Sequence, residues 1–201
     1  MSSLDRPDAL AARLDSPTGI TAQDLTQALD AMDYPGRLAF VRALVHRRHE
    51  NLWNLAEGHM EASLDQIVPA DLDPGRTQVW DGKNSMMMFN LFQKRFTRPT
   101  GQDDVVWGFN EHFWRWFSGP GYFVGRVEER RGILYLDYKA QPPYAPPGWP
   151  PVKSNTGFPR GLVYGYDDEV RPVSKDVVIG MPTSVTAAGK QYFIATRGAV
   201  V

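Results

Sequence analysis

The chain has 201 residues, of which 42% are hydrophobic and 22% charged, ordinary usage for a folded protein with one sizeable core. Its 22 lysine and arginine residues nearly balance 23 acidic ones, and a net charge of -1 offers no basic field to attract nucleic acid. Because there are no cysteines, disulfides, thiolate catalysis and cysteine-ligated metal sites are excluded.

Residues 1–70 have a helical pattern. Thr21 followed by Asp24 approximates a capping box, and apolar residues then recur at spacings of three and four. Pro35-Gly36 separates a short helix from a second one that begins near residue 37. Leu52 and Trp53 continue the apolar stripe of the second helix, so we expect this helical segment to pack against the outside or the mouth of the domain that follows.

After Pro69 the pattern changes to short β-branched and aromatic runs between turn residues, which predicts a β-domain over residues 71–201. Tight turns are expected at 130–132, 167–169 and 187–190. Consecutive hairpins imply antiparallel neighbours, since no crossover helix separates them. The expected strands lie near residues 77–81, 85–97, 103–109, 121–129, 132–140, 160–167, 169–181 and 190–197. Eight such strands after a helical segment indicate an α+β or mainly β protein, as a sandwich or a closed barrel.

Residues 141–159 interrupt the strands with seven prolines, too many for a central strand. Tyr144, Trp149 and Phe158 give this stretch rings that can cover an apolar surface. We therefore expect an ordered loop that acts as a lid over the β-domain.

Trp80-Asp81-Gly82-Lys83-Asn84 opens the β-domain, and Arg197 lies on the last expected strand. With this pair, residues 77–197 resemble the calycin superfamily, the lipocalins and fatty-acid-binding proteins. The resemblance implies a barrel in which the cation of Arg197 packs across Trp80 and closes the bottom. Gln78 stands where the family has glycine, and the helical first third has no counterpart there. Alternatively, Trp80 is an ordinary core residue and Arg197 a solvated strand end.

Five of the six tryptophans fall between residues 80 and 149, a density typical of a small-molecule cavity, to which Met86-Met87-Met88 would add adaptability. The alternative is that a small β-domain uses rings because each buries much area. Amides and phenols beside the rings could fix a ligand's polar atoms. The expected lining is Trp80, Asn84, Trp107, Asn110, Tyr122, Tyr135, Asp137 and Tyr164.

Three residues are acid–base candidates. His112 lies between polar residues and aromatic rings, which could bring its pKa near neutrality, or it could merely cap a short helix. Strand alternation places Tyr135 and Asp137 on one face. If that face is the interior, Asp137 becomes a functional carboxylate; if it is the outside, Asp137 pairs with Lys139 or a neighbouring arginine.

His46 and His49 are spaced to chelate a metal, but they lie in a charged run that favours a solvated helix face. No nucleophile elbow and no phosphate-binding loop occur. We therefore expect neither a metal nor another cofactor.

The leading hypothesis is binding of a small, largely apolar or aromatic ligand inside the barrel. The alternatives are a cofactor-independent isomerase, cyclase or hydratase that uses the same cavity, and a protein-interaction module. Nucleic-acid binding is not expected, because the net charge is -1. A membrane span is not expected, because the longest apolar runs are only a few residues. The chain start lacks the pattern of a secretory signal, which predicts a cytoplasmic protein. The ligand's identity and the oligomeric state, a homodimer included, stay open.

Overall fold

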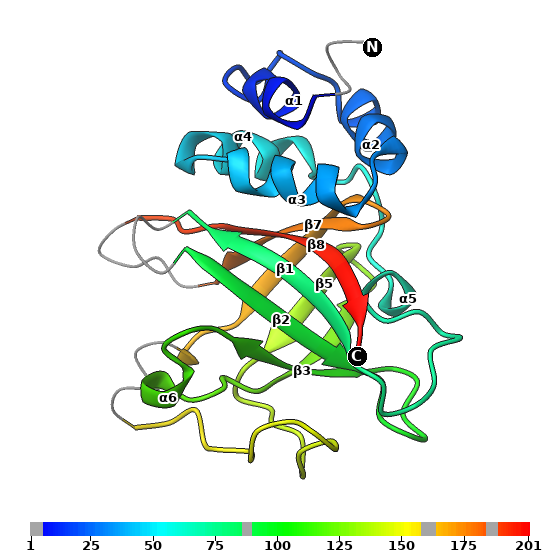
Figure 1. Ribbon diagram of the computed structural model, residues 1–201, viewed down its shortest axis with the longest axis vertical. Helices are drawn as coiled ribbons and strands as arrows, with labels where there is room; N and C mark the ends of the chain where they lie inside the picture. Colours follow the sequence, from blue (N-terminus) through cyan, green and yellow to red (C-terminus); the bar gives the residue numbers. More distant parts are fainter. Residues whose placement is uncertain (1–5, 86–89, 158–163, 184–188) are drawn as a thin grey trace.

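A computed structural model of the chain describes residues 6–85, 90–157, 164–183 and 189–201. Eight antiparallel strands follow one another in chain order and close into a barrel, because the first strand pairs with the last. Helices from the start of the chain stack on one side of this barrel (Figure 1). The predicted fold class is thus confirmed, and the barrel is the correct choice over the sandwich. Met86–Met88, Phe158, Pro159 and part of the expected turn at 187–190 lie outside the described residues.

In the described residues 6–77, five short helices precede the first strand. They are α1 (Pro7–Arg13), α2 (Ala22–Ala31), α3 (Tyr34–Ala43), α4 (His46–Leu55) and α5 (Leu64–Ile67). The expected cap is present, since Thr21 Oγ1 accepts a hydrogen bond from the backbone N–H of Asp24 at 3.1 Å. The single long helix expected from residue 37 is wrong, because Leu44 and Val45 are extended and divide it into α3 and α4.

The helical layer packs on the outside of the barrel, as expected. Leu52 and Trp53 of α4 join the outward-facing side chains of Ile179 and Ile194 in one apolar cluster. Arg171 reaches from the barrel to this layer, with its guanidinium carbon 3.8 Å from the Trp53 ring centroid. This cation–π contact, together with a 2.8 Å hydrogen bond from Arg171 to the Trp53 carbonyl, ties the two layers.

His49 is completely buried, so the solvated helix face expected for it is wrong. The physical reason is the break before α4, which restarts the helix at a different phase and turns His49 inward. Its Nδ1 lies 2.9 Å from the Val45 carbonyl oxygen, while its Nε2 has no hydrogen-bond partner. Burial lowers the pKa of His49 to about 4, which keeps the ring neutral.

The strands are β1 (Gln78–Asn84), β2 (Leu91–Thr97), β3 (Val106–Glu111), β4 (Phe123–Glu128), β5 (Ile133–Asp137), β6 (Asp168–Ser174), β7 (Val177–Pro182) and β8 (Phe193–Val200), with α6 (Arg115–Ser118) between β3 and β4. The expected strand 169–181 is in fact two strands, because the chain turns at residues 175–176. The turn expected at 167–169 is wrong, since Asp168 and Glu169 open β6. Of the expected strand 160–167, the described residues 164–167 are not part of the sheet.

The two ends of the barrel differ. We call the end with the connections 98–105, 129–132 and 175–176 the closed end, and the end with the connections 85–90, 112–122, 138–167 and 183–192 the mouth end. At the closed end Trp80 is buried and donates to the Ile67 carbonyl at 2.9 Å. The guanidinium of Arg197 lies 5.7 Å from the Trp80 ring centroid, so the expected cation–π contact is confirmed.

The described part of the proline-rich loop, residues 141–157, lies along the outer wall of β3 and β4 instead of over the mouth. Trp149 packs edge-on against Phe109, with ring centroids 4.7 Å apart, and Tyr144 packs on Trp107 at 5.1 Å. Asn155 donates to the carbonyls of Tyr122 and Tyr138 at 2.7 and 2.8 Å. The loop is therefore an added layer on the side of the barrel, seen in yellow along the bottom of Figure 1.

Candidate functional site

The interior of the barrel is filled by side chains. Trp80, Phe96, Leu136 and Phe193 leave beside them a cavity of about 10 Å³, room for one water at most. The open, aromatic-lined interior cavity expected from the sequence is therefore not found among the described residues. A ligand could enter the interior only if side chains moved.

The expected lining residues do not converge on one cavity. Asn110 and Tyr164 are buried at the mouth end of the interior, and Trp80 fills its closed end. Trp107 and Tyr122 face outward beneath the proline-rich loop. Asn84, at the end of β1, is only half-buried.

The face expected for Tyr135 and Asp137 is reversed. Leu134 and Leu136 fill the interior, so the alternating residues of β5 point outward. The Tyr135 hydroxyl donates to Asp167 at 2.7 Å, and the Asp137 carboxylate accepts the backbone N–H of Lys139 at 2.8 Å. Both side chains are engaged on the outer wall, and neither shares a hydrogen bond with His112 in the described part of the chain.

A buried polar cluster, which the sequence analysis missed, occupies the mouth half of the interior. We call it the Lys94 cluster: Lys94, Asn110, Tyr138 and Asp168. Lys94 Nζ donates to Tyr138 Oη at 2.7 Å, and to Asn110 Oδ1 and Asp168 Oδ2 at 3.0 Å each. The Tyr138 hydroxyl also donates to Asp168 at 3.0 Å. Lysine carries three N–H donors, and all three have an acceptor here.

Aromatic rings surround the charge at the centre of this cluster. The ring centroids of Phe92, Phe123, Tyr138 and Phe193 lie between 4.6 and 5.8 Å from Lys94 Nζ. Burial lowers the pKa of Lys94, while the negative charge of Asp168 opposes that change. The phenol of Tyr138 has a pKa raised well above its ordinary value, first by burial and then by Asp168. The hydroxyl of Tyr138 therefore stays protonated and can donate to the carboxylate.

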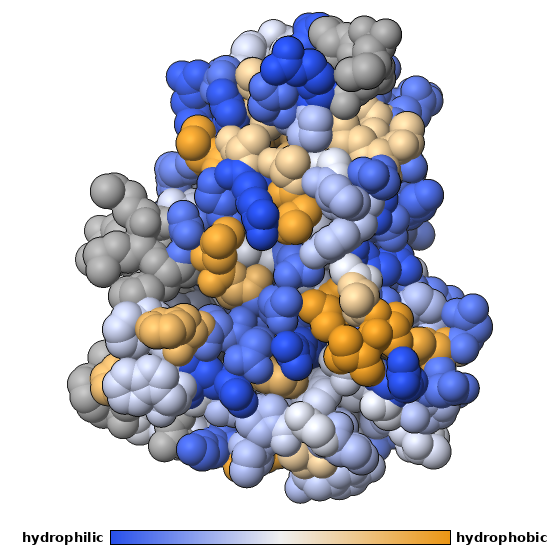
Figure 2. Space-filling model, in the orientation of Figure 1, coloured by the Kyte–Doolittle hydropathy of each residue, from blue (hydrophilic) through white to orange (hydrophobic). Residues whose placement is uncertain are grey.

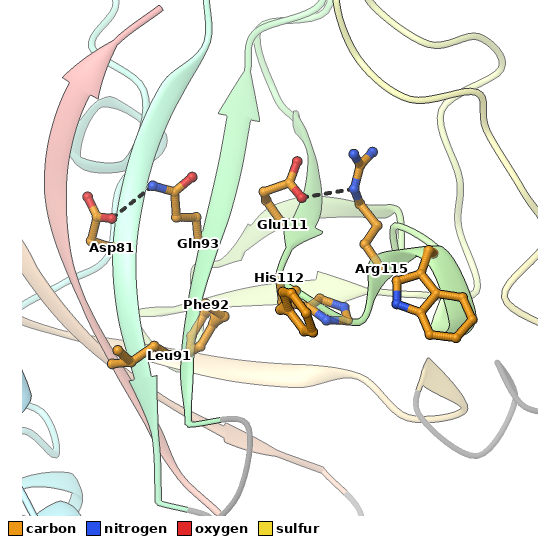
Figure 3. Close-up of a pocket in the computed structure, with 9 residues that line it drawn as sticks. Asp81, Leu91, Phe92, Gln93, Glu111, His112 and Arg115 are labelled. Carbon is orange, nitrogen blue, oxygen red and sulfur yellow. Dashed lines mark hydrogen bonds and ion pairs between the residues drawn. The ribbon is translucent and has the colours of Figure 1, made fainter.

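A surface groove of about 520 Å³ lies at the mouth end, beside the Lys94 cluster. We call it the mouth groove; it is lined by Asp81, Leu91, Phe92, Gln93, Glu111, His112, Phe113, Arg115 and Trp116. These side chains come from β1, β2, β3 and the region of α6 (Figure 3). Its volume and its mixture of rings with a few polar groups are typical of small-molecule sites.

Two rings of the mouth groove are largely open to solvent. Phe113 is 83% and Trp116 73% exposed, and Leu91 on the facing wall is also exposed. Figure 2 shows orange and pale side chains over α6, at the lower left of the view, with hydrophilic side chains beside them. Arg115 is held by Glu111 at 2.8 Å. Exposed apolar groups gathered in this way, with a polar rim, indicate a binding surface.

His112 lies at the inner edge of the mouth groove. Its Nε2 is 3.0 Å from the hydroxyl of Tyr164 and 3.3 Å from that of Ser118. Burial lowers the pKa of His112, so the imidazole is neutral at physiological pH. Burial also raises the pKa of Tyr164 to about 12. A neutral imidazole and a protonated phenol can exchange a proton with a bound molecule.

Phe92 lies between the mouth groove and the Lys94 cluster. It is one of the residues that line the groove, and its ring centroid is 5.8 Å from Lys94 Nζ. The ring lies over Gly82 of β1, where a Cβ would overlap it. The missing side chain at Gly82 is therefore what gives Phe92 its place between groove and interior.

The pattern Phe92-Gln93-Lys94-Arg95-Phe96 contained the signal for the Lys94 cluster, since alternation places Lys94 on the same face as two phenylalanines. Asp168 was missed because its acidic neighbours resembled a turn. Among the described residues, no group of three or more histidine and acidic side chains could hold a metal ion. The same residues include no helix with the length and apolar character to span a bilayer.

Comparison of the chain with models of protein families, with curated proteins and with solved structures gave no match. The closed eight-stranded barrel is compatible with a calycin-like fold. Fold and site together establish the class of this protein only as a barrel with a groove at its mouth end.

Proposed function

We propose that this protein binds a small, largely apolar or aromatic molecule in the mouth groove. The observation that carries the proposal is the contrast between the two spaces: about 520 Å³ in the groove and about 10 Å³ inside the barrel. A drug-sized molecule fits the first and not the second. The ligand class is the one expected from the aromatic density of the sequence, but the site moves from the interior to the rim.

The side chains of the groove suggest how such a molecule is held. Trp116 and Phe113 offer ring faces on one wall, and Leu91 offers an apolar contact on the other. His112 can donate or accept one hydrogen bond, which would orient a polar group of the ligand. Stacking on exposed rings gains affinity by removing their apolar area from water.

Titration with anilinonaphthalene sulfonate, a dye that fluoresces on apolar surfaces, tests the site. Trp116→Ala should weaken dye binding by about tenfold, which corresponds to about 1.4 kcal/mol. Tyr144→Ala is the matched control, because Tyr144 is also an exposed ring, at 59%, but lies outside the groove. Equal loss in both variants, or none in either, would place the binding surface elsewhere.

A second function, acid–base catalysis on the bound molecule, is favoured by the contacts of His112 with Tyr164 and Ser118. His112→Gln keeps a hydrogen-bonding side chain but removes the titratable group. If His112 is the acid–base group, His112→Gln should retain ligand affinity and lose turnover of a groove-bound substrate such as an activated ester or enolisable ketone. A variant that turns over such substrates at the wild-type rate would exclude His112 as the acid–base group.

A further inference from the structure

Lys94 has a position that ligand binding in the groove does not explain. Of the lysines in the described residues, it alone is buried, at 4% exposure, while Lys139, Lys153, Lys175 and Lys190 are exposed. A buried ion pair is weak support for a fold, because burying both charges costs about as much as their attraction returns. Two leucines would fill the same space more simply.

We propose that Lys94 is a reactive amine that captures an aldehyde or ketone as an imine inside the barrel, with the carbonyl compound entering from the mouth groove past Phe92. The inference rests on the geometry of the Lys94 cluster. An amine, a carboxylate and a phenol lie within 3.0 Å of one another, and apolar rings enclose them. These are the groups that imine formation requires: a nucleophile, a proton acceptor and a proton donor.

The reaction balances with the groups that are present. The ammonium of Lys94 gives one proton to Asp168, and the free amine then adds to the carbonyl carbon to form a C–N bond. The carbonyl oxygen takes a proton from the Tyr138 hydroxyl. The Tyr138 phenolate then takes one of the two N–H protons of the adduct, which leaves a neutral amino alcohol. Loss of its hydroxyl as water, with the proton held by Asp168 as the second hydrogen, leaves a C=N bond on a nitrogen that keeps its other proton, while Asp168 is ionised and Tyr138 protonated as at the start.

Overall, an ammonium and a carbonyl compound become a protonated imine and one water, so the site carries one positive charge before and after. Asp168 can therefore pair with the product as it does with the ammonium, and the surrounding rings stabilise either cation. Burial, which lowers the pKa of Lys94, makes the free amine more accessible at neutral pH than on an exposed lysine.

Phe92 controls access in this proposal. Among the described residues, Phe92 both lines the groove and has its ring near Lys94. It lies near the start of β2, and its ring packs over Gly82, which has no side chain. Rotation of Phe92 into the groove would join the two spaces. The space made available is that of the ring itself, which suits a flat aromatic aldehyde.

Competitive labelling of the wild-type protein tests the proposal without a variant that has to fold. The protein is treated with benzaldehyde and sodium cyanoborohydride, which reduces an imine to a stable amine, and peptides are quantified by mass spectrometry. Lys94 should be modified faster than Lys153, because burial lowers the pKa of its amine and so raises the free-amine fraction at neutral pH. A purely structural Lys94 would be the slowest lysine to react, and that result would overturn the proposal.

Two variants test the route. Phe92→Ala should speed the labelling of Lys94 and leave Lys153 unchanged, while Phe117→Ala, a control at an exposed ring outside the groove lining, should change neither. Unchanged labelling in Phe92→Ala would refute entry past Phe92. The dye titration reports on the groove and the reduced benzaldehyde adduct reports on Lys94, so failure of one function is distinguishable from failure of the other.

Discussion

Replacing Lys94 by methionine tests the ion pair inside the barrel. Methionine keeps the length and the ring contacts of the side chain but removes the charge and three hydrogen bonds. Asp168, whose side chain is 7% exposed, would keep the Tyr138 hydroxyl as its remaining side-chain donor in the cluster. Breaking a buried pair on one side costs about 3–5 kcal/mol, so Lys94→Met should lower the free energy of unfolding by about that amount.

Urea unfolding at neutral pH measures this loss. Lys139→Met is the matched control, because its side chain is 72% exposed in its pair with Asp167, and it should cost less than about 1 kcal/mol. Adding Asp168→Asn to Lys94→Met removes the stranded charge and should recover part of the stability. If Lys94→Met costs no more than Lys139→Met, the charge of Lys94 is not held by the cluster and the reasoning is refuted.

Three further predictions concern the layers around the barrel. Trp53→Ala should cost about 3–5 kcal/mol in urea unfolding, because the ring is buried between the helical layer and the barrel, against Arg171, and a cost below about 1 kcal/mol would contradict this packing. His49 has a pKa of about 6.5 in the unfolded chain and about 4 in the folded one, so the free energy of unfolding should fall by up to about 3 kcal/mol as the pH falls through this window. His49→Leu should flatten that part of the pH profile of stability. An unchanged profile would assign the effect to other groups. Asn155→Ala removes two buried hydrogen bonds of the proline-rich loop and should cost about 1–3 kcal/mol and speed tryptic cutting at Lys153; equal cutting rates would show that these bonds do not hold the loop.

The fold class was predictable because periodicity and turn chemistry are local properties. The cap at Thr21 and the turn that ends at Gly132 are each determined by a few adjacent residues, and both are present. The contact of Arg197 with Trp80 followed from the calycin resemblance. The turn at residues 175–176 was missed because a strand that reverses within two residues leaves a nearly continuous β pattern.

The site was less predictable because it depends on which face of each strand points inward. Tyr135 and Leu136 are neighbours, and a shift of one residue exchanges their faces. Lys94 was missed because a lysine is rarely buried unless partners from other strands satisfy it, and β2 alone does not reveal Asp168 or Tyr138. The groove residues all lie within residues 81–116, but which of their side chains share one surface depends on the register of β1, β2 and β3.

Fluorine NMR of the protein labelled with fluorotryptophan tests the central claim, that ligands bind at the rim and not in the interior. The six tryptophans include Trp116 in the mouth groove, Trp80 at the closed end and Trp149 within the proline-rich loop. Saturation with an apolar ligand that lacks a carbonyl group should shift the resonance of Trp116 and leave those of Trp80 and Trp149 in place. A shift of Trp80 with Trp116 unchanged would put the ligand inside the barrel and contradict the account.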